Sequence, residues 1–398
     1  MRQSRASSSM GNGLLRAVNG MVNGACNIRD DCACLALHFF LRRQISSGLD
    51  RGLMERHNGP MPLTPPLEPN TAKRPLEGQR AWIISDGKAG HEVQCLGVAN
   101  ALGVKVDIKR VAPRGLAKAL APWGAVSGRE KFGQSGSPFA PPWPAIAFAT
   151  GRLTTPYIRA LKRLAGEETF TVILLDPKTR DSSADLFWVP EHDTRRGTNV
   201  ITTMTSPHAY SPGRLSELRK AVPAEIASLP HPRIAVLIGG PNGDYRYTPG
   251  DEARLISALR RLSQSGAGLM LTPSRRTPPA LSAAIDVATL GSPRLFWNGT
   301  GDNPYPSILA HADAFLVTAD SVNMAGEAAA TGRPIYIFYP TGGSAKFDRY
   351  HQALEAKGIT RRLLDTNYIS LEWRFEPVDA ASVIAGDIED RWLARQRR

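Results

Sequence analysis

The residues best suited to bind phosphate stand in the stretch TADSVNMAGEAAATGRP, residues 318–334. A short apolar run precedes this stretch and helix-like composition follows it, which places its polar turn at a helix N-terminus. Free backbone N–H groups and the helix dipole make such a turn an anion site. We predict that Ser321, Asn323 and Met324 line a phosphate and that Glu327 holds a hydroxyl of a sugar or ribose. A strand–turn–helix unit without any ligand is the alternative interpretation.

Two further polar stretches are expected at the same edge of a sheet. Gly239, Gly240 and Asn242 follow an apolar run, and glycines there let the backbone come close to a phosphate. Arg275 and Arg276 follow the next apolar run, and guanidinium groups at that edge can offset the charge of a diphosphate. Ligands of open α/β sheets bind along the carboxyl edge, so we assign these residues to a donor nucleotide. Plain turns would use the same residue types.

The stretch SDGKAGH, residues 85–91, joins the first expected strand to the first expected helix. A carboxylate or an imidazole can take the proton of an attacking hydroxyl, which makes Asp86 and His91 the catalytic candidates. The sequence does not decide between them, and a tight turn whose histidine caps the helix is the alternative. The Gly-Lys-Ser/Thr ending of a P-loop is missing. The residues assigned to the acceptor side are Lys88, Gly90, Arg152 and Asp176.

Alternating strand and helix patterns must position these loops, and such alternation is typical of open parallel sheets. We predict an α/β protein with two Rossmann-like domains facing across a cleft. The N-terminal domain is expected at residues 80–229 and the C-terminal domain at residues 230–398. Residues 1–79 are predicted to be a poorly ordered extension and linker, because Arg, Ser, Gly, Asn and Pro dominate them. Their acid-free start also fits an organelle transit peptide.

An irregular segment, residues 122–144, interleaves aromatic and basic side chains. One interpretation is docking on an anionic membrane surface or a lipid acceptor. The other is an insertion that covers a sheet edge. The side chains concerned are Trp123, Phe132, Phe139, Trp143, Arg129 and Lys131.

The composition excludes several classes of protein. The chain has 398 residues, of which 42% are hydrophobic, and no apolar run reaches the roughly 20 residues of a membrane span. A formal charge of +13 favours an acidic partner, but no nucleic-acid-binding motif is present. Cys26, Cys32 and Cys34 complete no metal site with later histidines, so we expect no metal and a reducing compartment.

Three of these stretches together resemble the ELM1 family: residues 82–92, 239–242 and 318–334. The last also resembles the donor-nucleotide signature of GT-B glycosyltransferases. Bacterial members of the ELM1 family are described as candidate glycosyltransferases and the plant member as a mitochondrial fission factor. The similarity spans about residues 80–373 and implies a GT-B fold, with the donor in the second half and the acceptor in the first.

We therefore expect metal-independent transfer of a hexosyl group from a nucleotide-diphosphate sugar to an envelope glycolipid or polysaccharide. No cofactor and no nucleic acid is expected, and the location would be the cytoplasm, with peripheral contact to the inner membrane. One alternative is a non-catalytic adaptor in organelle fission at the mitochondrial surface. Another is a nucleotide-sugar epimerase, which shares the fold.

Overall fold

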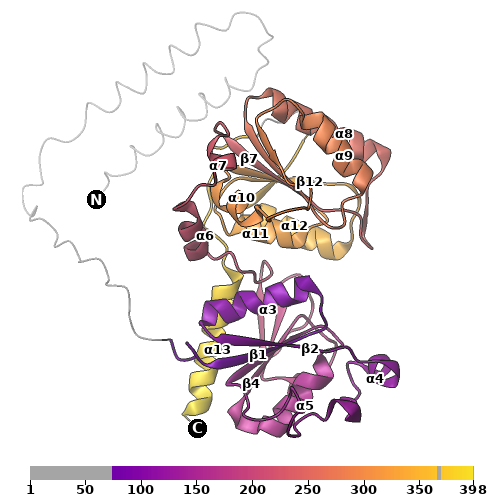
Figure 1. The fold of residues 1–398 in the computed structure, drawn as a ribbon, viewed down its shortest axis with the longest axis vertical. Helices are drawn as coiled ribbons and strands as arrows, with labels where there is room; N and C mark the ends of the chain where they lie inside the picture. The colour runs from indigo at the N-terminus through magenta and orange to yellow at the C-terminus, as the bar shows by residue number, and fades with distance from the viewer. Residues whose placement is uncertain (1–73, 365–368, 398) are drawn as a thin grey trace, which may run out of the picture. The chain divides into compact units, whose positions relative to one another are not determined.

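The computed structural model describes residues 74–364 and 369–397 of the protein. The predicted extension up to residue 73 and its three cysteines lie outside the described residues. Two six-stranded sheets organise the chain, and all their strand pairs are parallel (Figure 1). The predicted α/β class with two Rossmann-like halves is therefore confirmed. No helix in the described part of the chain has the length and apolar content needed to cross a membrane.

The first sheet has the strand order β2-β1-β3-β4-β5-β6. Every residue of β3, β4 and β5 is buried, as expected for parallel strands whose two faces are covered by helices. The elements of this half are β1 (Arg80–Ser85), α3 (Ala89–Leu102), β2 (Lys105–Arg110), α4 (Gly115–Leu120), β3 (Ile146–Thr150), α5 (Thr155–Ala165), β4 (Phe170–Leu174), β5 (Leu186–Pro190) and β6 (Val200–Thr203).

The second sheet has the order β10-β9-β7-β11-β12-β14. Counted along the chain this is the order 3-2-1-4-5-6 of a dinucleotide-binding sheet. A small antiparallel pair, β8 with β13, lies beside it. The elements are β7 (Arg233–Ile238), β8 (Tyr245–Arg246), α8 (Pro249–Gln264), β9 (Gly268–Pro273), α9 (Pro279–Thr289), β10 (Arg294–Phe296), α10 (Tyr305–His311), β11 (Ala314–Thr318), α11 (Val322–Ala329), β12 (Ile335–Phe338), β13 (Thr341–Gly342), α12 (Ala345–Ala356) and β14 (Thr360–Arg362).

Helices near the ends of each half pack on the other half's core. Helices α6 (Pro212–Arg219) and α7 (Ala224–Ala227) place Leu215 and Ile226 in the core of the second sheet. The last helix, α13 (Ala380–Gln396), lies against α3 and puts Ile384 and Ile388 into the core of the first sheet (Figure 1). The fully buried Leu76 joins the same core, so packing begins before residue 80. The halves are thus bound together by exchanged helices.

The irregular segment packs onto the first sheet through most of its aromatic residues. Phe139 is only 2% exposed and stacks on Phe132 with ring centroids 4.8 Å apart. Trp143 meets Trp82 of β1 edge-on at 5.9 Å. Trp123, in contrast, is 66% exposed. The docking interpretation therefore fails for Phe139, whose side chain is part of the core, and the insertion interpretation fits this part of the segment.

Candidate functional site

The predicted polar loops stand where the strand order of each sheet reverses. In the second sheet, Gly239 follows β7 and Asp320 follows the adjacent strand β11. In the first sheet, Asp86 follows β1 and Gly151 follows the adjacent strand β3. At such a switch point the two connections leave in opposite directions and open a crevice, where ligands of these sheets bind. The topology thus places the donor and catalytic candidates at favourable positions.

Asp320 is the centre of the loop cluster on the second sheet. Its side chain is fully buried. The carboxylate accepts hydrogen bonds from Gly240 N–H at 2.8 Å, the Tyr247 hydroxyl at 2.7 Å and the Arg276 guanidinium at 2.9 Å. The sequence analysis did not single out Asp320; the available signal was an acidic residue directly after a buried strand.

Gly239 and Gly240 allow this cluster to pack closely. A Cβ atom at Gly239 would lie 2.0 Å from Asp320 Oδ2, and one at Gly240 would lie 2.1 Å from the carbonyl oxygen of Arg276. The Gly239 N–H donates to Thr318 Oγ1 at 2.8 Å, and the Gly240 N–H is taken by Asp320. The side-chain oxygen Oδ1 of Asn242 accepts hydrogen bonds from the N–H groups of Asp244 and Tyr245, both at 2.8 Å. These three residues therefore build the cluster, and the two glycine N–H groups already have acceptors.

Arg275 and Arg276 have different surroundings despite their adjacency. Arg276 donates to the carbonyl oxygen of Gly240 at 2.6 Å and pairs with Asp320, so it braces the two loops. Arg275 is exposed and forms no ion pair or side-chain hydrogen bond with any residue that the structure describes. Of the two guanidinium groups, that of Arg275 is available to a ligand.

The N-terminus of α11 offers unused hydrogen-bond donors. The N–H groups of Val322, Asn323 and Met324 have no acceptor within residues 74–364 and 369–397. Ser321 precedes them and makes no capping bond through its hydroxyl. Asn323 is exposed, while Ser321 is buried and Met324 packs half-buried against the core. Three free N–H groups at the positive end of a helix dipole form a site for an anion.

Glu327 lies on the buried face of the same helix. Its carboxylate accepts a hydrogen bond from the Tyr305 hydroxyl, and 9% of the residue surface is exposed. Burial raises the pKa of Glu327 to about 7, although the bond from Tyr305 works in the opposite direction. The carboxylate is nearly enclosed, so its contact with a donor hydroxyl stays a prediction.

The raised pKa of Glu327 gives a testable dependence of stability on pH. Between its ordinary value of 4.5 and about 7, the folded chain keeps a proton that the unfolded chain has lost. The free energy of unfolding should therefore fall as pH rises through this window. Glu327→Gln removes this contribution to the pH dependence and should make the protein about 2 to 4 kcal/mol more stable than the parent at pH 8.

Urea titrations at pH 5 and pH 8 measure this difference. Glu355→Gln, at an exposed position of α12, is the matched control and should behave as the parent does. An unchanged pH dependence in Glu327→Gln would show that the carboxylate is already ionised in the folded chain.

Asp86 and His91 form a hydrogen-bonded pair in the first loop. Asp86 Oδ1 lies 3.0 Å from His91 Nδ1, and the Asp86 side chain is only 2% exposed. Burial alone would raise the pKa of Asp86, but the bond from Lys88 and the charge and bond of His91 outweigh it and lower this pKa. An ionised carboxylate only accepts hydrogen bonds, so Nδ1 of His91 donates to Asp86. In the neutral form of this imidazole Nε2 is then the hydrogen-bond acceptor.

The N-terminus of α3, which contains Gly90, approaches the N-terminus of α11. A Cβ atom at Gly90 would lie 4.0 Å from the Asn323 side-chain nitrogen. A further contact between the halves is the ion pair of Lys346, on α12, with Asp193 at 3.0 Å. The structure thus brings the catalytic candidates of the first sheet next to the N-terminus of α11, where the donor candidates lie.

The remaining acceptor-side candidates are engaged within the first half. The Arg152 guanidinium donates to the carbonyl oxygen of Lys118 at 2.9 Å. Asp176 pairs with Lys178 and Arg195, both at 2.8 Å, and its side chain is 7% exposed. Arg152 stays exposed beside the first switch point, whereas Asp176 is held by its two cationic neighbours.

Comparison with known sequences decides the family. The family model described as mitochondrial fission ELM1 matches residues 89–392, which is more than half of the chain. The chain belongs to the mitochondrial fission ELM1 family. The resemblance read from the sequence is therefore confirmed.

Relatives of this ELM1 chain match it over part of their length. The mitochondrial fission protein ELM1 of Arabidopsis thaliana is 30% identical over 276 residues, which are 63% of this chain and 65% of that protein. An uncharacterised protein of Rickettsia prowazekii is 32% identical over 157 residues, 38% of this chain and 44% of that protein. Among solved structures, MurG of Acinetobacter baumannii is 14% identical with a TM-score of 0.41, over 80% of this chain and 92% of that one.

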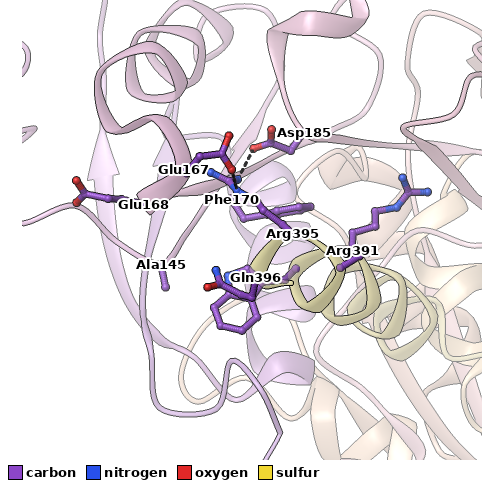
Figure 2. Close-up of a pocket in the computed structure, with 10 residues that line it drawn as sticks. Ala145, Glu167, Glu168, Phe170, Asp185, Arg391, Arg395 and Gln396 are labelled. Atoms are coloured by element: carbon purple, nitrogen blue, oxygen red, sulfur yellow. Dashed lines mark ion pairs between the residues drawn. The ribbon is translucent and has the colours of Figure 1, made fainter. Parts of the chain in front are cut away.

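This ELM1 chain also has a cavity of about 1010 Å³ at the amino edge of its first sheet (Figure 2). Ala145 and Phe170, at the beginnings of β3 and β4, line it together with the end of α13. Arg395 of that helix pairs with Glu167 and, at 3.6 Å, with Asp185. None of the predicted site residues lines this cavity, and its ion pairs anchor α13 to the first sheet.

A smaller cavity of about 390 Å³ lies at the carboxyl edge of the second sheet. Tyr245, Tyr339 and His351 are among the residues that line it. His351 Nε2 donates to the carbonyl oxygen of Ala319 at 2.8 Å, and its buried Nδ1 has no partner among the described residues. Sequence reasoning missed this histidine, because nothing in its local pattern distinguishes it from a packing residue.

Proposed function

We propose that this chain binds a nucleoside-diphosphate sugar at the second sheet and transfers the sugar to a hydroxyl group activated at the first sheet. The observation that carries the proposal is the position of both polar loops at the switch points of their sheets. The approach of Gly90 to Asn323 supports a single ligand in contact with both loops.

The donor diphosphate would lie against the N–H groups of Val322, Asn323 and Met324. Arg275 would supply a mobile positive charge, and the helix dipole would add a fixed one. Both charges stabilise the diphosphate more strongly as it leaves, since its negative charge then increases. The pair of the buried Asp320 and the partly exposed Arg276 would keep the two loops at a constant distance, because its hydrogen bonds join them directly.

The transfer step assigns different roles to the two catalytic candidates. His91 Nε2 would take the proton of the acceptor hydroxyl as the acceptor oxygen forms a bond to the anomeric carbon and the bond to the diphosphate breaks. Asp86 would hold the imidazole in the required tautomer and stabilise the imidazolium that forms, as in other Asp–His pairs. An envelope glycolipid or polysaccharide hydroxyl is the proposed acceptor.

Replacing Arg275 tests the donor site. Arg275→Gln should weaken the binding of a nucleoside diphosphate by about 1.5 to 3 kcal/mol, or roughly 10- to 150-fold, because a charge-assisted hydrogen bond is lost. Isothermal titration calorimetry with uridine, guanosine and adenosine diphosphates measures the change. Arg260→Gln, an exposed arginine on α8, is the matched control. If the two variants bound nucleoside diphosphates with equal affinity, Arg275 would not be part of the donor site.

The similarity to the mitochondrial fission protein ELM1 of Arabidopsis thaliana supports a second candidate, a non-catalytic adaptor in organelle fission. An adaptor would have no use for a free diphosphate site, whereas a transferase requires one. A thermal-shift screen with nucleotide sugars distinguishes the two, since only a ligand-binding chain is stabilised. Analysis of the sugar product then separates transfer from epimerisation.

A further inference from the structure

A surface of the first half combines exposed apolar side chains on the short helix α4 and the turn after it. Helix α4 buries none of its residues. Leu116 is 73% exposed, Leu120 is 50% exposed and Trp123 is 66% exposed. Leu116 and Leu120 are four residues apart and so lie on one face of the helix. We call Leu116, Leu120 and Trp123 the α4 ridge.

The backbone that carries the α4 ridge is fixed from below. Arg159 of α5 donates to the carbonyl oxygens of Pro122 and Trp123, both at 2.9 Å. Arg152 donates to the carbonyl oxygen of Lys118 at 2.9 Å. Ala121, between the helix and the tryptophan, is 1% exposed. The polypeptide is thus held against the first half while the three large apolar side chains point away from it.

The charge around the α4 ridge is positive. Residues 112–134 contain four basic residues and one acid. The acid, Glu130, accepts a hydrogen bond from the Tyr157 hydroxyl at 2.9 Å. A hollow of about 630 Å³ borders the helix. Leu116 and Leu120 line it together with the basic Arg114 and Arg129 and the acidic Glu130. Apolar and basic groups therefore share one surface.

A second exposed apolar pair shows what distinguishes the α4 ridge. Val287 and Leu290, at the end of α9, are 69% and 74% exposed. Their nearest charged residue in sequence, Asp286, is paired with Arg294 at 2.6 Å. The charge of Arg294 is thus neutralised by Asp286. Val287 and Leu290 therefore lack the unpaired positive charge nearby that an anionic surface requires.

We propose that the α4 ridge docks this chain on an anionic lipid bilayer. Leucine and tryptophan side chains enter the boundary between headgroups and acyl chains, and a nearby basic cluster contacts anionic headgroups. An acidic protein surface would use the basic side chains but would leave three large apolar groups without a comparable environment. The bilayer proposal does not depend on sugar transfer, because lipid binding is measured without any donor.

Co-sedimentation of the full chain with vesicles tests the proposal. One set is phosphatidylcholine alone and the other is phosphatidylcholine mixed with phosphatidylglycerol. The chain should bind the mixed vesicles preferentially at low salt. The double variant Arg114→Gln/Lys118→Gln should bind them about 30-fold more weakly, at about fivefold for each charge removed.

The apolar part is tested by Leu116→Ser/Leu120→Ser/Trp123→Ser, which should lower vesicle binding by about tenfold or more. Val287→Ser/Leu290→Ser is the matched control and should bind as the parent does. Circular dichroism confirms that each variant is folded. Unchanged binding by either α4 variant, equal binding to both vesicle types, or no vesicle binding by the parent would each overturn the proposal. The last result would indicate a protein partner at this surface.

Discussion

The variant His91→Gln should transfer sugar about a thousandfold more slowly than the parent, while its affinity for the donor stays the same. Glutamine keeps a polar side chain near Asp86 but cannot take a proton at neutral pH, and general-base catalysis contributes about 10²- to 10⁴-fold. The measurement is the kcat and KM of transfer from a nucleotide sugar to an acceptor hydroxyl. Loss of kcat with an unchanged KM is the expected pattern.

Two further variants complete this test. Asp86→Asn should also lower kcat by about 10²-fold or more, because an amide no longer fixes the protonated Nδ1 of His91. His231→Gln is the matched control, since His231 forms a similar exposed pair with Asp313 at 2.6 Å but lies outside both switch points. If the His91→Gln variant kept the parental kcat, His91 would not be the general base and would only stabilise the turn before α3.

Removing the Asp320 carboxylate should lower the free energy of unfolding by about 2 to 4 kcal/mol, the range for leaving two largely buried hydrogen-bond donors without an acceptor. Asp320→Ala leaves the Gly240 N–H, the Tyr247 hydroxyl and the Arg276 guanidinium without their acceptor. Unsatisfied buried donors and an unpaired charge account for the cost. Urea unfolding at pH 7 measures it.

An exposed aspartate provides the control for this prediction. Asp348→Ala, on α12, should change the free energy of unfolding by less than about 0.5 kcal/mol. The double variant Asp320→Ala/Arg276→Gln should be less destabilised than the sum of its single variants, because the two residues share one interaction. Strict additivity would contradict the role of Asp320 as the centre of the loop cluster.

Sequence patterns identified the loops because each follows an apolar run, and parallel strands bring their carboxyl ends to one edge. They did not identify Asp320, since its partners Gly240 and Arg276 are 80 and 44 residues away in the chain. The pairing of β7 with β11 on one side and with β9 on the other brings them together. For the same reason the sequence pattern predicted the same role for Arg275 and Arg276. In the structure, Arg276 is bonded to Gly240 and Asp320, whereas the side chain of Arg275 contacts neither.

Burial was the second property that the sequence could not supply. Glu327 stands in a run of small residues whose buried face is set by the packing of α11, so its enclosure beside Tyr305 was not foreseen. Phe139 and Trp143 are aromatic residues of the kind found on membrane-docking surfaces, but in the structure they pack against Trp82. Helix α13 follows the second sheet in the chain, yet its apolar residues complete the core of the first.

The most direct test of the central claim is a crystal structure of the full chain with a bound nucleoside diphosphate. The account predicts density for the diphosphate against the N–H groups of Val322, Asn323 and Met324, with the Arg275 guanidinium turned towards it. Density at any other place, or none under conditions where calorimetry shows binding at saturation, would contradict it.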